Sequence, residues 1–314
     1  MKSPDTSTRR GLDLAPALKS LHPAAARWIG ALIRMTSNHP AMSQILDVIE
    51  RLSDRPYRAN FILLGEAGTG KEGLARALAH LSCPDGPLVR FDVAGFPEEE
   101  VLELLCGTGK RPGVAEMADG GSILIDEVAG LGPRVQAALL RLVKSGRCDP
   151  RDLSTAHTLT TGVDDEGSLR KAKRLDVRII AVSDRDLAAE VAQGRFRHDL
   201  YFRLARVVLW LPPLRERIED VGPAAIWMGN RILQQANLPW ELMGAEELQR
   251  AGAEEKSHAI ALQPDAIAAL QSYPWPGNFR ELEVVLERAL LLYRQSASVG
   301  ALEISKSLAT NPKA

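Results

Sequence analysis

The sequence contains no apolar run that approaches the ~20 residues needed to cross a membrane. Its start, Met1 to Arg10, is polar and lacks the apolar region of a signal peptide. A net charge of -1 gives no overall attraction to nucleic acid or to acidic membranes. Cysteine is scarce, and the spacing of the three residues matches no metal site, so they are interpreted as free thiols in a reducing compartment. These absences predict a cytoplasmic protein that does not engage a membrane. The cysteines are Cys83, Cys106 and Cys148.

Apolar runs of strand length alternate with helical patterns up to Leu214. At 314 residues the chain is long enough for one large domain or two, with a buried core. Strands that alternate with helices predict a parallel five-stranded sheet covered by helices on both faces. After Leu214 the strand signals stop, and the remainder is predicted to be helical. The strand-like runs are 60–64, 88–92, 122–126, 177–182 and 207–211.

A glycine-rich turn follows the first of these runs and opens a helical segment at 71–81. Glycines let successive backbone N–H groups and the helix N-terminus face phosphate oxygens, and Lys71 can reach the β- and γ-phosphates. A chance turn before a helix is the alternative, but the strand, the turn and the helix start are all present. Glu72 stands where Ser or Thr would normally hold Mg²⁺. The turn predicts a nucleotide-binding P-loop, which reads Gly65-Glu66-Ala67-Gly68-Thr69-Gly70-Lys71-Glu72.

Two acids, Asp126 and Glu127, end a buried strand about fifty residues after the P-loop. In a P-loop enzyme the first acid can position Mg²⁺, directly or through water, and the second can act as general base on the attacking water. Alone, such acids often only cap the next helix. Together with the P-loop they predict ATP hydrolysis, with ATP and Mg²⁺ as cofactors. The strand reads Gly120-Gly121-Ser122-Ile123-Leu124-Ile125-Asp126-Glu127.

Residues from about Thr36 to Arg294 resemble the central AAA+ ATPase domain of the sigma-54-dependent transcription activators. The P-loop with Glu72 after the lysine, the strand ending in Asp-Glu and three later segments carry the resemblance, in order. It implies an α/β AAA+ P-loop NTPase with a small helical lid. The expected domains are an N-terminal extension at 1–35, an α/β nucleotide-binding domain at 36–214, and a lid with a C-terminal tail at 215–314. The later segments are Phe196-Arg197-His198-Asp199-Leu200-Tyr201, Leu211-Pro212-Pro213-Leu214-Arg215-Glu216-Arg217 and Trp275-Pro276-Gly277-Asn278-Phe279-Arg280-Glu281-Leu282.

The resemblance implies roles for further residues. Ser183 and Asp184 occupy the first sensor, at the end of a central strand, and Arg280 matches the second sensor, which reports phosphate state to the lid. Arg197 and Arg203 match the arginine fingers that reach the γ-phosphate of a neighbouring subunit. An isolated Arg is usually a solvated surface residue, but planar guanidiniums suit a phosphate site beside carboxylates. The chain is therefore expected to form a ring with itself, most simply a hexamer.

The loop that touches the sigma factor departs from the family's pattern. The family carries Gly-Ala-Phe-Thr-Gly-Ala there, whereas this chain has a shorter stretch without Phe-Thr, at Cys106 to Gly113. A protein client is still expected, and a sigma factor or an RNA polymerase component is one candidate.

Two aspartates, Asp92 and Asp184, replace asparagines of the family's pattern. The family's Asn at the first position hydrogen-bonds the catalytic Glu and restrains it. We expect the Asp92 carboxylate to lie near Glu127 and to raise one of the two pKa values, because two close carboxylates do not both ionise freely. Asp92 is therefore included among the catalytic residues, and hydrolysis with altered control is predicted.

The connection at 147–176 is about thirty residues long and carries charges of both signs. In the family a second mobile loop lies here, and both a partner-binding loop and a solvated insertion remain open. The sequence shows neither the receiver or ligand-sensing domain nor the helix-turn-helix that the family usually adds. Direct DNA binding is not expected.

Three functions follow from these observations. The leading one is a ring-forming ATPase that converts hydrolysis into loop movement against a protein client in bacterial transcription regulation. The second keeps the motor but gives it a client other than a sigma factor, as in a chaperone-like remodeller. The third is a nucleotide-dependent scaffold or inhibitor with little turnover.

Overall fold

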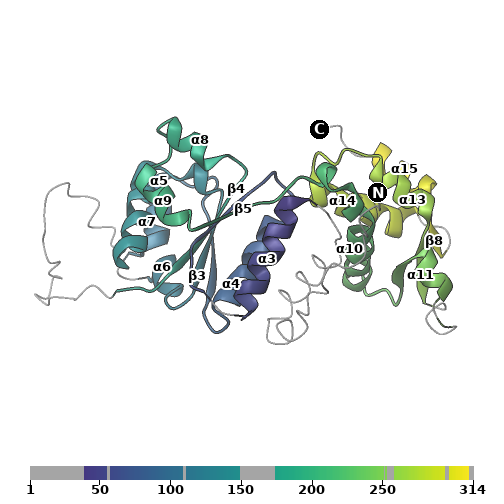
Figure 1. Ribbon diagram of the computed structural model, residues 1–314, viewed down its shortest axis with the longest axis horizontal. Helices are drawn as coiled ribbons and strands as arrows, with labels where there is room; N and C mark the ends of the chain where they lie inside the picture. Colours follow the sequence, from purple (N-terminus) through teal and green to yellow (C-terminus); the bar gives the residue numbers. More distant parts are fainter. Residues whose placement is uncertain are drawn as a thin grey trace, which may run out of the picture.

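The computed structural model describes residues 39–54, 57–108, 111–148, 174–250, 252, 258–293 and 297–310. The N-terminal extension expected at 1–35 and most of the insertion at 147–176 lie outside the described residues. Figure 1 shows an α/β part and a mainly helical part side by side along the long axis of the molecule. No described helix is long and apolar enough to cross a membrane.

The α/β part is built on a parallel five-stranded sheet in the order β2-β3-β4-β1-β5. Its register places Asp92 opposite Asp126, and Leu64 opposite Ser183. All strands therefore end at one edge, where the residues that follow them can form a site. This sheet and the lid that follows it confirm the predicted fold class. The strands are β1 (Phe61–Leu64), β2 (Leu88–Asp92), β3 (Ser122–Asp126), β4 (Arg178–Ser183) and β5 (Val207–Trp210).

Helices cover both faces of the sheet, as the alternation of strands and helices predicts. On the face toward the lid lie α3 (Pro40–Asp54) and α4 (Lys71–Ser82), packed on side chains such as Phe61 and Leu63. The other face is covered by α5 (Glu98–Cys106), α7 (Pro133–Ser145) and α9 (His198–Leu204). Shorter elements are α6 (Val114–Met117), η1 (Val128–Gly130), α8 (Leu187–Ala192), η3 (Leu214–Glu216) and η4 (Ile218–Asp220).

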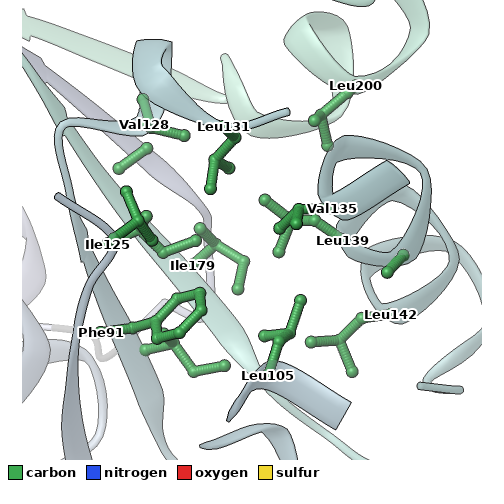
Figure 2. Close-up of a cluster of buried hydrophobic side chains, with 14 of the residues drawn as sticks. Phe91, Leu105, Ile125, Val128, Leu131, Val135, Leu139, Leu142, Ile179 and Leu200 are labelled. Carbon is green, nitrogen blue, oxygen red and sulfur yellow. The ribbon is translucent and has the colours of Figure 1, made fainter. Parts of the chain in front are cut away.

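Figure 2 shows the core between the sheet and α7. Val135, Leu139 and Leu142 recur at helical spacing, so one face of α7 points at Ile125 and Ile179 of the central strands. All five side chains are buried, and each contributes about 1.5–3 kcal/mol of transfer free energy. This packing fixes β3, which leads to the predicted catalytic acids Asp126 and Glu127, and β4, which leads to the predicted first sensor.

The lid is helical but also contains a three-stranded parallel sheet, so the prediction that strands stop after Leu214 was wrong. The strands are only two to four residues long, and such short apolar runs carry no period that separates strand from helix. They are β6 (Glu241–Gly244), β7 (Ala259–Leu262) and β8 (Ser298–Val299). The helices are α10 (Val221–Gln235), α11 (Ala245–Arg250), α13 (Pro264–Gln271), α14 (Asn278–Glu287), the π-helical η5 (Arg288–Tyr293) and α15 (Ala301–Ala309).

A disulfide joins Cys106 to Cys148, so the prediction of three free thiols was wrong for these two residues. Cys106 ends α5 and Cys148 follows α7, and the packing of these two helices brings their Cα atoms to 5.0 Å. The two cysteines are 42 residues apart in the chain, so the sequence alone does not indicate that they lie close together. Cys83 remains a free thiol.

Candidate nucleotide-binding site

The P-loop between β1 and α4 has the backbone geometry that its glycines allow. Gly68 and Gly70 have φ of 80° and 100°, in the left-handed region that other residues rarely adopt. A Cβ on Gly68 would lie 2.4 Å from the carbonyl oxygen of Gly277, so the loop also approaches the lid more closely than a side chain permits. The first residue of α4 is Lys71, and the helix N-terminus therefore faces the loop.

Lys71 is buried and its ammonium group donates hydrogen bonds to the backbone oxygens of Gly65 and Glu66. Burial lowers the pKa of Lys71, while the charges of Glu127, Asp184 and Asp126 oppose that shift. The lysine therefore lies close to two predicted catalytic acids, Asp126 and Glu127, and to Asp184 of the predicted first sensor. A phosphate group at the loop would replace the two carbonyl contacts with stronger charge-assisted ones.

Glu127 follows β3 and has a left-handed backbone, with φ of 53°. Such a conformation strains a non-glycine residue, and strained residues are concentrated at functional sites. Burial first, then a hydrogen bond and the charge of Asp184, raise the pKa of Glu127 to about 7, and Lys71 acts in the opposite direction. The two carboxyl groups form one interacting pair at the ends of adjacent strands β3 and β4.

Asp92, which was expected to pair with Glu127, has contacts with Ala94 and Arg90. Its carboxylate accepts a hydrogen bond from the Ala94 N–H at 3.2 Å and lies 3.7 Å from Arg90. Asp126 is its neighbour in the sheet register, and the carboxyl partner of Glu127 is Asp184. The pKa of Glu127 is raised by burial and by Asp184, the other substituted aspartate.

Ser183 and Asp184, the predicted first sensor, have side chains with different surroundings. The Ser183 hydroxyl donates to the Arg185 carbonyl oxygen at 2.9 Å and accepts from the Arg185 N–H at 3.0 Å. This hydroxyl stabilises the turn after β4 and is fully buried. Asp184, in contrast, faces Glu127 and Lys71. Of the two, only Asp184 has its side chain in the cluster around Lys71.

The start of α14 is docked directly on the P-loop. Phe279 N–H donates to the Gly68 carbonyl oxygen at 3.0 Å, and the Asn278 amide donates to Ala67 O at 3.0 Å and to Glu66 Oε2 at 3.2 Å. The charge of Arg280 contributes to lowering the pKa of both Lys71 and Glu72, so the second-sensor arginine is also close to the loop. The lid thus contacts the site through consecutive residues.

Two arginines of the segment after β5 complete this junction, and sequence reasoning assigned neither a role. Arg215 pairs with Glu66 through two hydrogen bonds of 2.6 and 2.9 Å, which first of all lower the pKa of Glu66. Arg217 is buried, donates to Thr69 O at 3.0 Å and lies 4.8 Å from the ring centroid of Phe279. Burial lowers the pKa of Arg217 to about 10. Their motif was recognised, but its spacing alone does not indicate these contacts.

A cavity of about 1120 Å³ opens beside the P-loop and extends into the lid. This volume exceeds the roughly 300–1,000 Å³ of typical small-ligand pockets. The lining combines apolar side chains from α3 and the lid with the P-loop, the two acids and polar side chains of the lid, and such a mixture suits a ligand with an apolar base and charged phosphates. The lining includes Met42, Ile45, Gly70, Lys71, Asp126, Glu127, Leu211, Met228, Phe279 and Arg280.

The donor set beside the P-loop fits Mg²⁺ when the ion is shared with phosphate. Among the described residues, no group of three or more His, Cys, Asp or Glu side chains could hold a metal ion without further ligands. Asp126 does provide a carboxylate oxygen there, which Arg90 contacts at 3.2 Å. Mg²⁺ in nucleotide sites is typically held by one or two carboxylates, phosphate oxygens and water.

Arg197 and Arg203 lie apart from this cluster, on and beside α9 across the sheet from α4. Arg197 makes two hydrogen bonds to Asp199, of 2.9 and 3.0 Å, and the Arg203 carbonyl oxygen accepts from Asn60 at 3.0 Å. Among the described residues, those that line the cavity include neither Arg197 nor Arg203. Their role across a subunit boundary stays a prediction.

Comparison with known proteins gives two family matches. The model of the sigma-54 interaction domain matches residues 35–210, and that of the AAA+ ATPase lid domain matches residues 241–314. The chain is 33% identical to the Nif-specific regulatory protein of Azotobacter vinelandii over 264 residues, which cover 81% of this chain and 43% of that protein. It is 35% identical to the response regulator protein FleR of Pseudomonas aeruginosa over 263 residues, 81% of this chain and 48% of that one. The chain thus spans about half the length of these relatives, or less.

Solved structures agree with this assignment of the fold. NtrX from Brucella abortus in complex with ATP superposes with a TM-score of 0.67 at 29% identity, over 88% of this chain and 55% of that one. A RuvB mutant of Thermotoga maritima superposes with a TM-score of 0.52 at 12% identity, over 87% of this chain and 69% of that one. The second likeness concerns the fold alone.

Proposed function

The chain belongs to the sigma-54 interaction domain family of AAA+ proteins, and from this premise we propose that it binds and hydrolyses ATP to remodel a protein client in transcription regulation. The observation that carries the proposal is the cluster of Lys71, Asp126, Glu127 and Asp184 around the P-loop, closed on one side by the lid. Such a cluster combines a phosphate cation, a metal-side acid and a base whose pKa is near neutrality.

In this proposal the P-loop N–H groups and Lys71 bind the phosphates, and Asp126 holds Mg²⁺ directly or through water. The bound ion would neutralise phosphate charge in the reaction. Glu127 accepts a proton from the attacking water, and Asp184 sets the protonation state of Glu127. Arg280, together with Asn278 and Phe279 at the start of α14, transmits the phosphate state to the lid.

Assembly is part of the same proposal. Arg197 and Arg203 lie at α9, on the sheet face opposite α4, and do not line the cavity of their own chain, which supports their use by a neighbouring copy. A ring, expected to be a hexamer, would place each α9 beside the cavity of the next subunit. The site would then be completed only on association.

The client is inferred more coarsely. The stretch from Cys106 to Gly113 lacks the Phe-Thr of the family's sigma-contacting motif, and the disulfide to Cys148 fixes its first residue. These observations favour a client other than sigma-54 itself, while RNA polymerase components remain candidates. A cytoplasmic location also stays a prediction, because the disulfide weakens the inference of a reducing compartment.

A scaffold or inhibitor with little turnover is the second candidate. It is favoured by the raised pKa of Glu127, because a protonated carboxyl group cannot act as a base. Steady-state release of phosphate from ATP by the purified chain separates the two. Turnover that depends on Mg²⁺ supports the motor, and ATP binding without turnover at any pH supports the scaffold. Co-purification with sigma-54 then tests the client.

A further inference from the structure

Arg90 on β2 is a cation that belongs to none of the motifs and contacts three carboxylates. Its guanidinium lies 3.2 Å from Glu72 Oε1, 3.2 Å from Asp126 Oδ2 and 3.7 Å from Asp92 Oδ2. Arg90 and Asp92 point to the same face of β2, because side chains two residues apart share a face. Arg90 therefore links the end of the P-loop to the acid that ends β3.

The contact with Asp126 is the most protected of the three. The Asp126 side chain is 29% exposed, against 43% for Glu72 and 53% for Asp92. Less exposed pairs are less screened by solvent and salt, so the Arg90–Asp126 contact is the least screened of the three. Glu72 has a second cation, since Arg76 contacts the same Oε1 atom at 2.7 Å.

We propose that Arg90 is a positioning residue that holds Asp126 in the metal-free site and that Mg²⁺ must displace it. The inference rests on the proposed binding of ATP with Mg²⁺. A guanidinium and a divalent cation directed at one carboxylate repel each other at a separation of a few Å. Mg²⁺ is therefore expected to move Arg90 away from Asp126 and leave it on Glu72 and Asp92. Arg90 thus raises the Mg²⁺ concentration that the site requires.

The test measures the binding of a fluorescent ATP analogue to the full chain, first in EDTA and then as MgCl₂ is titrated in. Arg90→Gln removes the competing charge and is expected to lower the Mg²⁺ midpoint by about two- to fivefold, the range of a partly exposed ion pair. Arg90→Lys keeps the charge and should return the midpoint to within about twofold of wild type. The matched control is Arg76→Gln, which removes a similarly exposed arginine (51% against 46% for Arg90) from Glu72 without removing a contact of Asp126.

The outcomes separate this inference from the proposed function. If the wild-type chain binds no nucleotide with or without Mg²⁺, the proposed function is wrong. If nucleotide binds and the midpoint of Arg90→Gln equals or exceeds that of wild type, Arg90 does not compete with the metal and the inference is overturned. A lowered midpoint in Arg76→Gln as well would assign the effect to general charge and would also overturn it.

Discussion

The carboxyl groups of Glu127 and Asp184 follow adjacent strands, β3 and β4, and interact closely enough for Asp184 to raise the pKa of Glu127. A carboxyl group beside a neutral side chain ionises more readily than one beside another carboxyl group. Here burial and the neighbouring acid disfavour the charged form of Glu127, whose pKa lies near 7. The protonation state of the proposed base therefore changes within the physiological pH range.

ATP turnover is predicted to rise with pH through about 7, because Glu127 acts as a base only when it has lost its proton. Asp184→Asn removes the neighbouring charge, so the pKa of Glu127 should fall and the midpoint of the pH–rate profile should move to lower pH. The measurement is kcat against pH for both proteins at saturating ATP and Mg²⁺.

The control for this prediction is Asp92→Asn, the same change at the other substituted position. Its carboxylate contacts Arg90 and Ala94 and is not the partner of Glu127, so the midpoint pH should stay at the wild-type value. If the midpoint moves in Asp92→Asn but not in Asp184→Asn, the aspartate coupled to Glu127 is Asp92 and the assignment to Asp184 is wrong.

The same pKa has a consequence for stability. The pKa of Glu127 in the folded state is raised from 4.5 to about 7. The contribution of Glu127 to the free energy of unfolding is therefore fully present below about pH 4.5 and is lost as pH rises through about 7. The residue is partly exposed, so solvent screening reduces this contribution. Over this pH range the fraction of Glu127 that can act as a base rises, whereas the contribution of Glu127 to stability falls.

Lys71→Ala is predicted to abolish tight ATP binding, because it removes the cation that the P-loop directs at the phosphates. Glu127→Gln provides the contrast: binding should persist while turnover falls by ~10²–10⁴-fold, as for a lost general base. Calorimetry with ATP and steady-state phosphate release separate the two effects. Wild-type affinity in a folded Lys71→Ala protein would contradict the P-loop assignment.

The sheet and the P-loop could be predicted because their signals are local. The strand from Ser122 to Asp126 is a continuous apolar run, and the glycines before Lys71 directly reflect backbone geometry. The partner of Glu127 could not be predicted in the same way. Choosing between Asp92 and Asp184 requires the directions of their side chains at the ends of two parallel strands. The sequence does not give these directions, nor the contact of 3.7 Å between Asp92 and Arg90.

The lid contacts could not be read from the sequence for a related reason. Asn278 and Arg215 lie 212 and 149 residues from Glu66 in the chain, and only the folded lid brings them together. The motif containing each was recognised by resemblance, without the interaction that the residue makes. Motifs thus located the site but not its internal pairing.

Specific ATPase activity is predicted to rise with protein concentration, because Arg197 and Arg203 lie outside the cavity of their own chain. Arg203→Ala and Lys71→Ala should each be inactive alone. Mixed, they should recover part of the activity at junctions that pair an intact P-loop with an intact arginine. Turnover per chain that does not depend on concentration would argue for a complete site within one subunit.

Reduction of the Cys106–Cys148 disulfide is predicted to lower the free energy of unfolding by about 2–4 kcal/mol. The bond closes a loop across 42 residues of separation and so restricts the unfolded chain, and it also fastens the end of α5 to the residues after α7. Urea unfolding of the wild-type chain with and without reductant measures the difference.

Cys106→Ser should unfold like the reduced protein whether or not reductant is present. Cys83→Ser is the matched control, since it removes a thiol outside the disulfide and should keep the full response to reductant. If the wild-type curve is insensitive to reductant while Cys106→Ser is as stable as wild type, the bond does not stabilise the fold.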